Sequence, residues 1–378
     1  MALDRGGLTV PLRRRRRPPV QQDRILDALR QRIRSGALAP GARVPSQAEL
    51  VKRFGVSKVT AQRAVRCLVE DGFVVTGRRG TQVAAHPPHL SRYGLVFPVA
   101  SPEALRNRHL MALSREAERL LPPESGQEIR QYFVDERLLG AKSDSLRQLI
   151  HDVENGCLRG LVFATAPHYL AGTTVLTAEG LPRVALASAV APGVEWIQPE
   201  GPSFVERAIA YLAARGRRRT AVILYEDVKD EAIDGCLEEM RRQGLRTAPY
   251  WIHGVSLGTP RWARHCAHLM FRAGQKERPD SLIVWDDNLV EGATAGLVDA
   301  GVRVPDDVEV VAHCNFPWPT PSAVPAKRLG FDVRDALRAC LSAVEGQRQG
   351  QPRASAWRVI FDDEIVASGP TSVPDPRT

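Results

Sequence analysis

The spacing of apolar and polar positions divides the chain into two differently patterned parts. Up to about residue 86, apolar residues recur every three or four positions, the spacing of amphipathic helices. Beyond residue 92, short β-rich apolar runs alternate with amphipathic helical stretches, which is typical of parallel α/β sheets. The pattern therefore predicts a small, mostly helical domain followed by a larger α/β domain.

Two helices are predicted in the first part before residue 56. The apolar residues of the stretch 23–35 fall on one helix face: Ile25, Leu26, Leu29 and Ile33. A second helix is predicted to begin at Ser46, because Ser46-Gln47-Ala48-Glu49 has the S-x-x-E form of a capping box. Leu50 and Phe54 supply its apolar side, and Gly55 is well placed to end it in the left-handed conformation.

A third helix is predicted from Ser57, which serves as its N-cap. One face is small and apolar: Ala61, Ala64, Val65 and Leu68. The opposite face is mainly polar and cationic: Lys58, Val59, Gln62, Arg63 and Arg66. A helix that packs on small residues and presents polar and cationic groups outward meets the requirements of a reader of the DNA major groove.

A short β-hairpin is predicted to complete this part. Two β-rich runs, 73–76 and 81–83, are joined by Gly77-Arg78-Arg79-Gly80, a turn with two arginines at its tip. A capping box or a basic helix face by itself would indicate only a helix start or a solvated surface. The joint order is much more specific, and it indicates a winged helix-turn-helix DNA-binding domain over residues 20–86.

This stretch resembles the GntR family of bacterial transcription regulators over about residues 20–85. The family pattern, approximately PG-x-x-LPSE-x-x-LA-x-x-x-GVSR-x-TVR-x-A-x-x-x-L-x-x-x-G with a GxGT wing, is matched at Pro40-Gly41, Val44-Pro45-Ser46, Glu49-Leu50, Gly55-Val56-Ser57-Lys58, Thr60, Ala64, Leu68, Gly72 and Gly80-Thr81. With the outward face of the third helix, the resemblance implies these DNA contacts: Ser46, Gln47, Ser57, Lys58, Val59, Thr60, Gln62, Arg63, Arg66, Arg78, Arg79, Gly80 and Thr81.

The chain departs from the family at several of its reading positions. Ala48 and Gln62 stand where the family usually has arginines, Lys58 replaces a third arginine, and Arg78 replaces the first glycine of the wing. Arginine reads guanine with two hydrogen bonds, whereas glutamine prefers adenine. We therefore expect an operator that differs from the family's common one.

The charge distribution agrees with a DNA-binding domain at this end of the chain. Residues 1–86 carry a net charge of +12, whereas residues 87–378 carry −3. Residues 1–19, with five consecutive arginines from Arg13 to Arg17, are predicted to be a disordered basic tail. The tail either adds non-specific DNA affinity or is only a solvated extension.

Composition favours a cytoplasmic protein. The six cysteines are scattered without C-x-x-C spacing, which suits reduced thiols: Cys67, Cys157, Cys236, Cys266, Cys314 and Cys340. No run approaches the length of a membrane span, and the start lacks the apolar core of a signal peptide. His265, Cys266 and His268 do not converge as ligands on a helix, so we expect neither a metal site nor a cofactor.

The second part, residues 92–368, is predicted to form parallel α/β sheets. Its expected strands are 93–99, 129–134, 160–164, 183–186, 220–225, 281–285, 308–312 and 327–331. Its expected helices are 103–120, 146–155, 204–215, 231–243, 261–273, 289–300 and 333–345. Ligands of such sheets lie outside the carboxyl ends of the strands. The candidate ligand-binding residues there are Ser101, Thr165, Asp227, Asp286, Asp287, Asn288 and Asn315.

Residues 278–315 resemble the effector domain of LacI-type regulators, which is itself similar to periplasmic sugar-binding proteins. The matching positions are Arg278-Pro279, Asp287, Gly292, Leu297, Gly301, Val304-Pro305 and Asp307-Val308. The resemblance implies a two-lobed domain over residues 92–368, in which Asp287 bonds a ligand hydroxyl. The chain has Ala232 where the family has an arginine, and its 310–315 segment departs from the family's VVGFDD.

A GntR-like reader joined to a LacI-like effector domain resembles regulators of the arabinose-repressor type. We expect a non-enzymatic, homodimeric repressor that binds operator DNA and holds a sugar-like effector between two lobes. Three crossovers near 196–201, 316–326 and 356–360 are expected to form the hinge. Two alternatives remain open: a sugar-binding sensor with little specific DNA role, and an enzyme fused to a DNA-binding domain. Whether the effector releases or promotes DNA binding also remains open.

Overall fold

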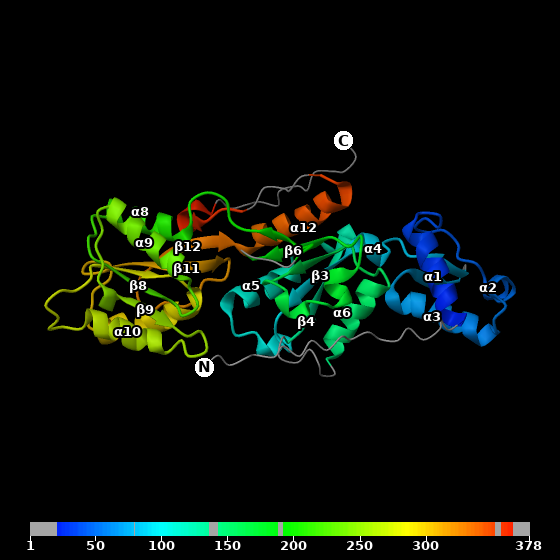
Figure 1. Ribbon diagram of the computed structural model, residues 1–378, viewed down its shortest axis with the longest axis horizontal. Helices are drawn as coiled ribbons and strands as arrows, with labels where there is room; N and C mark the ends of the chain where they lie inside the picture. The colour runs from blue at the N-terminus through cyan, green and yellow to red at the C-terminus, as the bar shows by residue number, and fades with distance from the viewer. Residues whose placement is uncertain (1–20, 79, 136–142, 188–191, 352–356, 366–378) are drawn as a thin grey trace, which may run out of the picture. The chain divides into compact units, whose positions relative to one another are not determined.

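A computed structural model describes residues 21–78, 80–135, 143–187, 192–351 and 357–365 (Figure 1). The chain divides into two compact units. The first unit comprises residues up to 104, 117–197 and 340–354, and the second comprises 105–116, 198–339 and residues from 355 onward. Within the described ranges, none of the helices combines the length and apolar character needed to cross a bilayer. The expected basic tail, 1–19, lies outside the described residues.

The first unit begins with the winged helix-turn-helix. Its elements are α1 (Gln21–Arg34), α2 (Gln47–Phe54), α3 (Lys58–Asp71), β1 (Val74–Gly77) and β2 (Gly80–Val83). Strands β1 and β2 pair antiparallel as the wing. The apolar stripe of α1 is buried against α3, and Ile25, Leu50 and Leu68 are completely enclosed in the shared core. The predicted order of elements is confirmed.

The cap signals read from the sequence determine where these helices begin and end. The backbone N–H of Glu49 donates to Ser46 Oγ at 3.3 Å, and the N–H of Ser46 donates to Glu49 Oε2 at 2.7 Å, so the capping box is complete. Ser57 caps α3 by accepting from the N–H of Thr60. Gly55 ends α2 with a φ of 64°, a left-handed conformation that favours glycine.

The rest of the first unit is a five-stranded parallel sheet in the order β4-β3-β5-β6-β7. Its strands are β3 (Arg92–Phe97), β4 (Glu128–Phe133), β5 (Gly160–Phe163), β6 (Arg183–Leu186) and β7 (Glu195–Ile197). Its helices are α4 (Pro88–Ser91), α6 (Asp144–Glu154), α7 (Thr174–Thr177) and the carboxyl-terminal part of α12 (Val333–Gln349). Helix α12 packs closely on β5, since a Cβ at Gly160 would lie 2.3 Å from Val344 Cγ1.

Polar contacts join the winged helix to this sheet layer within the first unit. Asp71, the last residue of α3, is ion-paired with Arg30 of α1 and lies 2.9 Å from Nε2 of His151 on α6. Arg30 also donates to the side chain of Asn155, and the buried Cys157 belongs to the core of the winged helix. The end of α3 is therefore fastened to the α/β layer beside it.

The second unit is a six-stranded sheet in the order β13-β12-β11-β10-β8-β9. Its strands are β8 (Thr220–Tyr225), β9 (Ile252–Val255), β10 (Ser281–Val284), β11 (Glu309–Phe316), β12 (Lys327–Asp332) and β13 (Ile360–Phe361). All neighbours are parallel except β13, which pairs antiparallel with β12. Its helices are α5 (Arg108–Ala117, up to Glu116), α8 (Phe204–Ala214), α9 (Asp230–Arg242), α10 (Trp262–Phe271), α11 (Val290–Asp299) and the start of α12.

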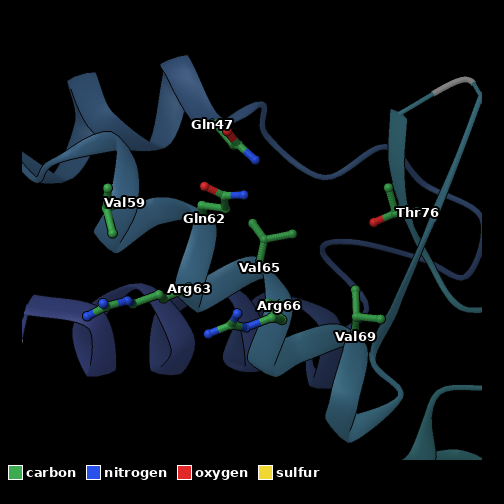
Figure 2. A pocket seen from close by; sticks show the side chains of 8 residues that line it. All are labelled: Gln47, Val59, Gln62, Arg63, Val65, Arg66, Val69 and Thr76. Carbon is green, nitrogen blue, oxygen red and sulfur yellow. The ribbon is translucent and has the colours of Figure 1, made fainter.

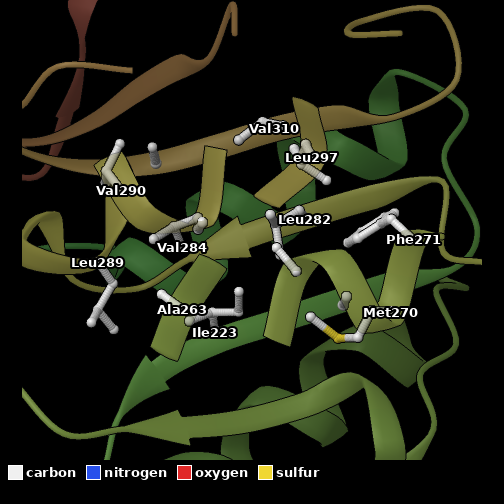
Figure 3. Packing of buried hydrophobic residues seen from close by; sticks show 14 of the residues in the cluster. Ile223, Ala263, Met270, Phe271, Leu282, Val284, Leu289, Val290, Leu297 and Val310 are labelled. Carbon is white, nitrogen blue, oxygen red and sulfur yellow. The ribbon is translucent and has the colours of Figure 1, made fainter. Parts of the chain in front are cut away.

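Alternate residues of the central strands serve two separate cores. On one face, residues such as Leu282 and Val284 pack with Met270 and Leu297 of α10 and α11 (Figure 3). On the other face, residues such as Ile283 pack with α8 and α9. A sheet that is covered on both faces is expected of a parallel α/β fold, so this part of the fold prediction is also confirmed.

Several element predictions need correction. Strand β11 does not end at residue 312 but continues to Phe316, so His313 and Asn315 lie within the strand and not after it. Strands β7 and β9 were not expected. The stretch 316–326 is not a crossover but a loop inside the second unit. Its repeated prolines are typical of linkers, which explains the wrong prediction.

The chain in fact returns to the first unit within α12, between Ala339 and Cys340. It leaves the first unit after Ile197, inside the expected crossover 196–201. The third expected crossover, 356–360, begins at a residue outside the described part of the chain.

Candidate nucleic-acid interface and effector site

The outward side of α3 carries an exposed stripe that we call the reading face: Val59, Gln62, Arg63, Arg66 and Val69. Four of these residues follow one another at intervals of three or four and therefore share one side of the helix. The opposite side is completely buried at Ala61, Ala64 and Leu68, which fixes the rotation of α3 about its axis. Burial of the small-residue face thus holds the reading face toward solvent.

The reading face forms one wall of an open hollow of about 480 Å³ (Figure 2). Its lining residues are Gln47, Val59, Gln62, Arg63, Val65, Arg66, Val69 and Thr76. Gln47 comes from the start of α2 and Thr76 from the first wing strand, so all three parts of the motif contribute. The hollow combines two amides, two guanidinium groups and three valines, which are the group types that bind base edges and thymine methyl groups.

The charges around the hollow are positive and largely exposed. Arg66 forms an exposed ion pair with Glu70 at 3.7 Å, which contributes little to stability. Lys58 and Arg63 are exposed, and no ion pair joins either of them to another residue that the structure describes. These two cations are therefore available to phosphate groups.

The structure places the remaining predicted DNA contacts around this surface. Ser46 and Ser57 begin α2 and α3, and their hydroxyls already accept the capping hydrogen bonds. Thr60 Oγ1 lies 2.9 Å from Ser57 Oγ. Arg78 is exposed at the wing, where Gly80 and Thr81 begin β2. Arg79 lies outside the described residues.

Sequence reasoning missed Val65, Val69 and Thr76 as lining residues. Val69 follows Val59, Gln62 and Arg66 at helical spacing, so the periodicity carried a signal for it. Val65 had been assigned wholly to the core, and its burial agrees with that, but it also lies at the floor of the hollow. Thr76 becomes a neighbour only through the fold of the wing.

In the second unit, Asp287 begins a series of side-chain hydrogen bonds that passes through Asn315 to His109. Its side chain is 1% exposed, and Nδ2 of Asn315 donates to its Oδ2 at 2.6 Å. Burial, with a smaller contribution from the neighbouring Asp286, raises the pKa of Asp287 to about 7. A carboxyl group with this pKa is partly protonated at neutral pH, so it can both donate and accept hydrogen bonds.

His109 of α5 is the last member of this series of hydrogen-bonded side chains. Its Nδ1 lies 3.1 Å from Oδ1 of Asn315, which can only accept, so Nδ1 carries the proton. Burial lowers the pKa of His109 to about 4, which keeps the ring neutral at pH 7. The series Asp287, Asn315 and His109 is therefore mutually satisfied.

Arg108, at the start of α5, also contacts the polar side chains beside Asp287. The backbone N–H of Arg108 donates to Asn288 Oδ1 at 2.9 Å, and the Arg108 guanidinium lies 3.6 Å from Glu291. Asn288 Nδ2 in turn donates to Asp286 Oδ1 at 2.7 Å. A ligand that bonds these side chains would have to replace contacts that the chain makes with itself.

The other predicted ligand residues are not part of this cluster. Asp227 follows β8 and is exposed. Ser101 and Thr165 lie in the first unit, just beyond the neighbouring parallel strands β3 and β5. No group of three metal-binding side chains is found among the described residues.

Sequence reasoning missed His109 and Arg108. They lie on a helix whose contacts with Asn315 and Asn288 span 206 and 180 residues, so no local pattern could indicate them.

Three tryptophans of the second unit have different surroundings. Trp251 is buried in the core between the sheet and α10. Trp318 Nε1 donates to Glu116 at 2.8 Å, and the guanidinium of Arg115 lies 4.8 Å from the centre of its ring. Trp262 is 52% exposed on α10. Contacts within the chain therefore account for Trp251 and Trp318.

Two family models match the chain. Residues 21–83 match the model of bacterial regulatory proteins of the gntR family, and residues 209–359 match that of the periplasmic binding protein-like domain. The chain therefore carries a GntR-family helix-turn-helix domain and a periplasmic-binding-protein-like domain, as the resemblances implied.

Curated relatives match a limited part of the chain. A histidine utilization repressor of Klebsiella aerogenes is 42% identical over 53 residues, which are 14% of this chain and 22% of that protein. A histidine utilization repressor of Pseudomonas aeruginosa is 34% identical over 102 residues, 27% of this chain and 41% of that protein. The chain thus spans less than half the length of these relatives.

Solved structures match a larger part of the chain. A LacI-family regulatory protein of Chloroflexus aggregans is 19% identical with a TM-score of 0.56 over 71% of this chain and 96% of that one. A LacI-family regulator of Lactobacillus casei with bound glucose is 17% identical with a TM-score of 0.51 over 72% and 97%. At these identities the likeness shows a shared fold, the two-lobed α/β fold of LacI-like regulators.

Proposed function

We propose that the chain is a transcriptional repressor that binds operator DNA through the reading face and is controlled by a small-molecule effector. The observation that carries this proposal is the exposed amide, valine and arginine surface of α3, set between α2 and the wing of a GntR-family domain. The +12 charge of residues 1–86 supports it, because phosphate binding requires such an excess. Repression is the activity named for the two curated relatives.

The test is equilibrium binding of the full-length chain to the DNA immediately upstream of its own gene. Affinity should fall steeply as salt rises, because the cations of the reading face and wing displace counterions from phosphates. Arg63→Ala should weaken binding, whereas Arg242→Ala, an exposed arginine of α9 in the second unit, should not. Salt-independent or absent binding would refute the proposal.

The effector site of this proposal lies at the carboxyl edge of the second unit's sheet. Asp286, Asp287, Asn288 and Asn315 converge there, and carboxyl and amide groups together suit the hydroxyl groups of a sugar or another polyhydroxy compound. Ser101, Thr165 and Asp227 remain proposed contacts. The test is a thermal-shift screen with mono- and disaccharides. A sugar that binds should raise the melting temperature of the wild-type chain, and the same sugar should not change the melting temperature of Asp287→Ala.

We further propose that the regulator acts as a homodimer without enzymatic activity, in the cytoplasm. Large apolar side chains are exposed on α10 and α11: Trp262 is 52%, Leu269 53% and Val298 53% exposed. Such side chains are expected to be covered by a second copy. Leu269→Glu should shift the chain from dimer to monomer in sedimentation, and a dimer that persists would contradict this interface. The domain limits 20–86 and 92–368 remain part of the proposal.

A further inference from the structure

We propose that the reading face recognises two neighbouring A·T base pairs, with Gln62 bonding the adenine of one and Val59 contacting the thymine methyl group of the other. The inference rests on the proposed function, since it requires that α3 enters a major groove. It deepens that function by naming the bases that are read.

The hydrogen-bonding groups of Gln62 match adenine. A glutamine amide offers one acceptor and two donors, and the major-groove edge of adenine offers the N6 amino group and the N7 acceptor. Guanine offers two acceptors, which arginine or lysine matches better. Gln62 is exposed in the hollow, and no hydrogen bond ties its side chain to another residue that the structure describes. Its amide is therefore available to a base.

Val59 supplies an apolar partner at the right distance from Gln62. It is 55% exposed near the amino-terminal end of α3, the end of a recognition helix that contacts base edges. Three residues along a helix advance about 4.5 Å, and one base-pair step advances about 3.4 Å. A side chain three positions before Gln62 therefore reaches the neighbouring pair, where the thymine methyl is the apolar group of the major groove.

The arginines beside Gln62 are placed for other contacts. The guanidinium group of Arg66 forms an ion pair with Glu70 of the same helix, at 3.7 Å. The side chain of Arg63 projects away from that of Gln62 (Figure 2). We assign Arg63 to the phosphate backbone, which leaves Gln62 and Val59 to read the step.

The first experiment is a selection from a pool of random duplexes by the full-length chain. The enriched half-site should contain two consecutive A·T pairs that become variable when the selection is repeated with Gln62→Ala and Val59→Ala. Both side chains are exposed, so neither variant should lose its fold. Arg63→Ala is the matched control, because it should weaken binding to all duplexes without changing the enriched bases.

The second experiment changes one recognition group at a time on the selected bases. Replacing the thymine by deoxyuridine removes only the methyl group and should weaken wild-type binding about fourfold. Replacing the adenine by 7-deazaadenine removes the N7 acceptor and should weaken it at least about fivefold. Val59→Ala should be less sensitive than wild type to the first replacement, because it has lost both γ-methyl groups. Gln62→Ala should be insensitive to the second, because it lacks the amide.

Two kinds of failure are distinguishable. Salt-dependent binding with G·C pairs at both positions, or equal sensitivity of wild type and variants to the modified bases, overturns the assignment of bases and leaves the regulator intact. Absence of any enriched duplex, with no salt-dependent affinity for DNA, overturns both proposals together.

Discussion

The reading face and the Asp287 cluster are both rich in polar side chains, but the two sites differ in what satisfies those side chains. On α3, Gln62 and Arg63 face solvent, and no hydrogen bond or ion pair joins either side chain to another residue that the structure describes. In the second unit, Asp287 and Asn315 are enclosed and bonded within the chain, and His109 completes their hydrogen bonds. The first surface is ready for its ligand, whereas the second must exchange internal contacts for external ones.

This difference bears on how the two sites respond to ligands. A preformed open surface gains affinity from each added contact. In a buried site whose side chains already bond one another, the binding free energy is smaller. It is only the difference between the ligand's contacts and the contacts with α5 that the ligand replaces. Effector binding at Asp287 would therefore displace the start of α5.

The largest expected effect comes from removing the scaffold of the reading face. Leu68→Ala empties part of a fully enclosed position in the winged-helix core and should cost about 2–5 kcal/mol of stability. DNA binding should be lost with the fold, as measured by urea unfolding and by gel shift. The neighbouring Val69→Ala, at an exposed position, is the control and should change stability by less than about 0.5 kcal/mol.

The next effect concerns the burial of Asp287. A folded-state pKa of about 7, above the unfolded value, means that the folded chain holds a proton which the unfolded chain releases between pH 4 and 7. Stability from this group is therefore present at low pH and is lost as pH rises to about 7. Relative to wild type, Asp287→Asn should gain stability over that range, by an amount on the order of 4 kcal/mol.

Urea unfolding at several pH values measures this difference. The lowered pKa values of His109 and His313 act in the opposite direction, so the comparison must be made between variant and wild type at each pH. A stability difference that does not change between pH 4 and 7 would show that Asp287 is not held in an apolar, self-satisfied site.

A smaller effect is expected for the cations of the reading face. Arg63→Ala should reduce the slope of log affinity against log salt by about 0.9, because one phosphate contact is lost. Arg264→Ala in the second unit is a matched control, since its guanidinium pairs with Asp299 at 2.5 Å and lies in a different unit. An unchanged slope for Arg63→Ala would remove this residue from the DNA-binding surface.

The smallest effect concerns the contact between α3 and α6. His151 of α6 is hydrogen-bonded to Asp71 of α3, and this hydrogen bond raises the pKa of His151 above its usual value. The stabilisation is therefore complete below about pH 6.5 and is lost as pH rises through the folded-state pKa. His151→Gln should remove this loss, which a melting-temperature profile from pH 6 to 8 would detect. A profile identical to that of wild type would show that the contact between His151 and Asp71 does not contribute to stability.

The winged helix was predictable from sequence because its signals are local. Ser46 with Glu49, Gly55 and Ser57 determine helix ends within a few residues, and the structure confirms each. The short strand β9 was missed because His253 and Gly254 interrupt its apolar run. The end of β11 was misplaced because buried polar residues there, such as Asn315, resemble the start of a loop.

The candidate effector site was only half predictable. Its strand-end residues could be named, because parallel strands end at the same edge of a sheet. His109 could not be named, since its contact with Asn315 joins residues 206 positions apart and depends on how α5 folds back. The reading face was almost fully predictable, because helical periodicity alone decides which residues of α3 face outward.

The most direct test of the account is the ratio of two affinities of the full-length chain at physiological salt. One duplex carries the DNA upstream of its own gene, and the other has the same composition in scrambled order. A sequence-specific regulator should bind the first at least about 1000-fold more tightly. Equal affinities would contradict the account, because the charge of residues 1–86 would then serve only non-specific binding and α3 would read no bases.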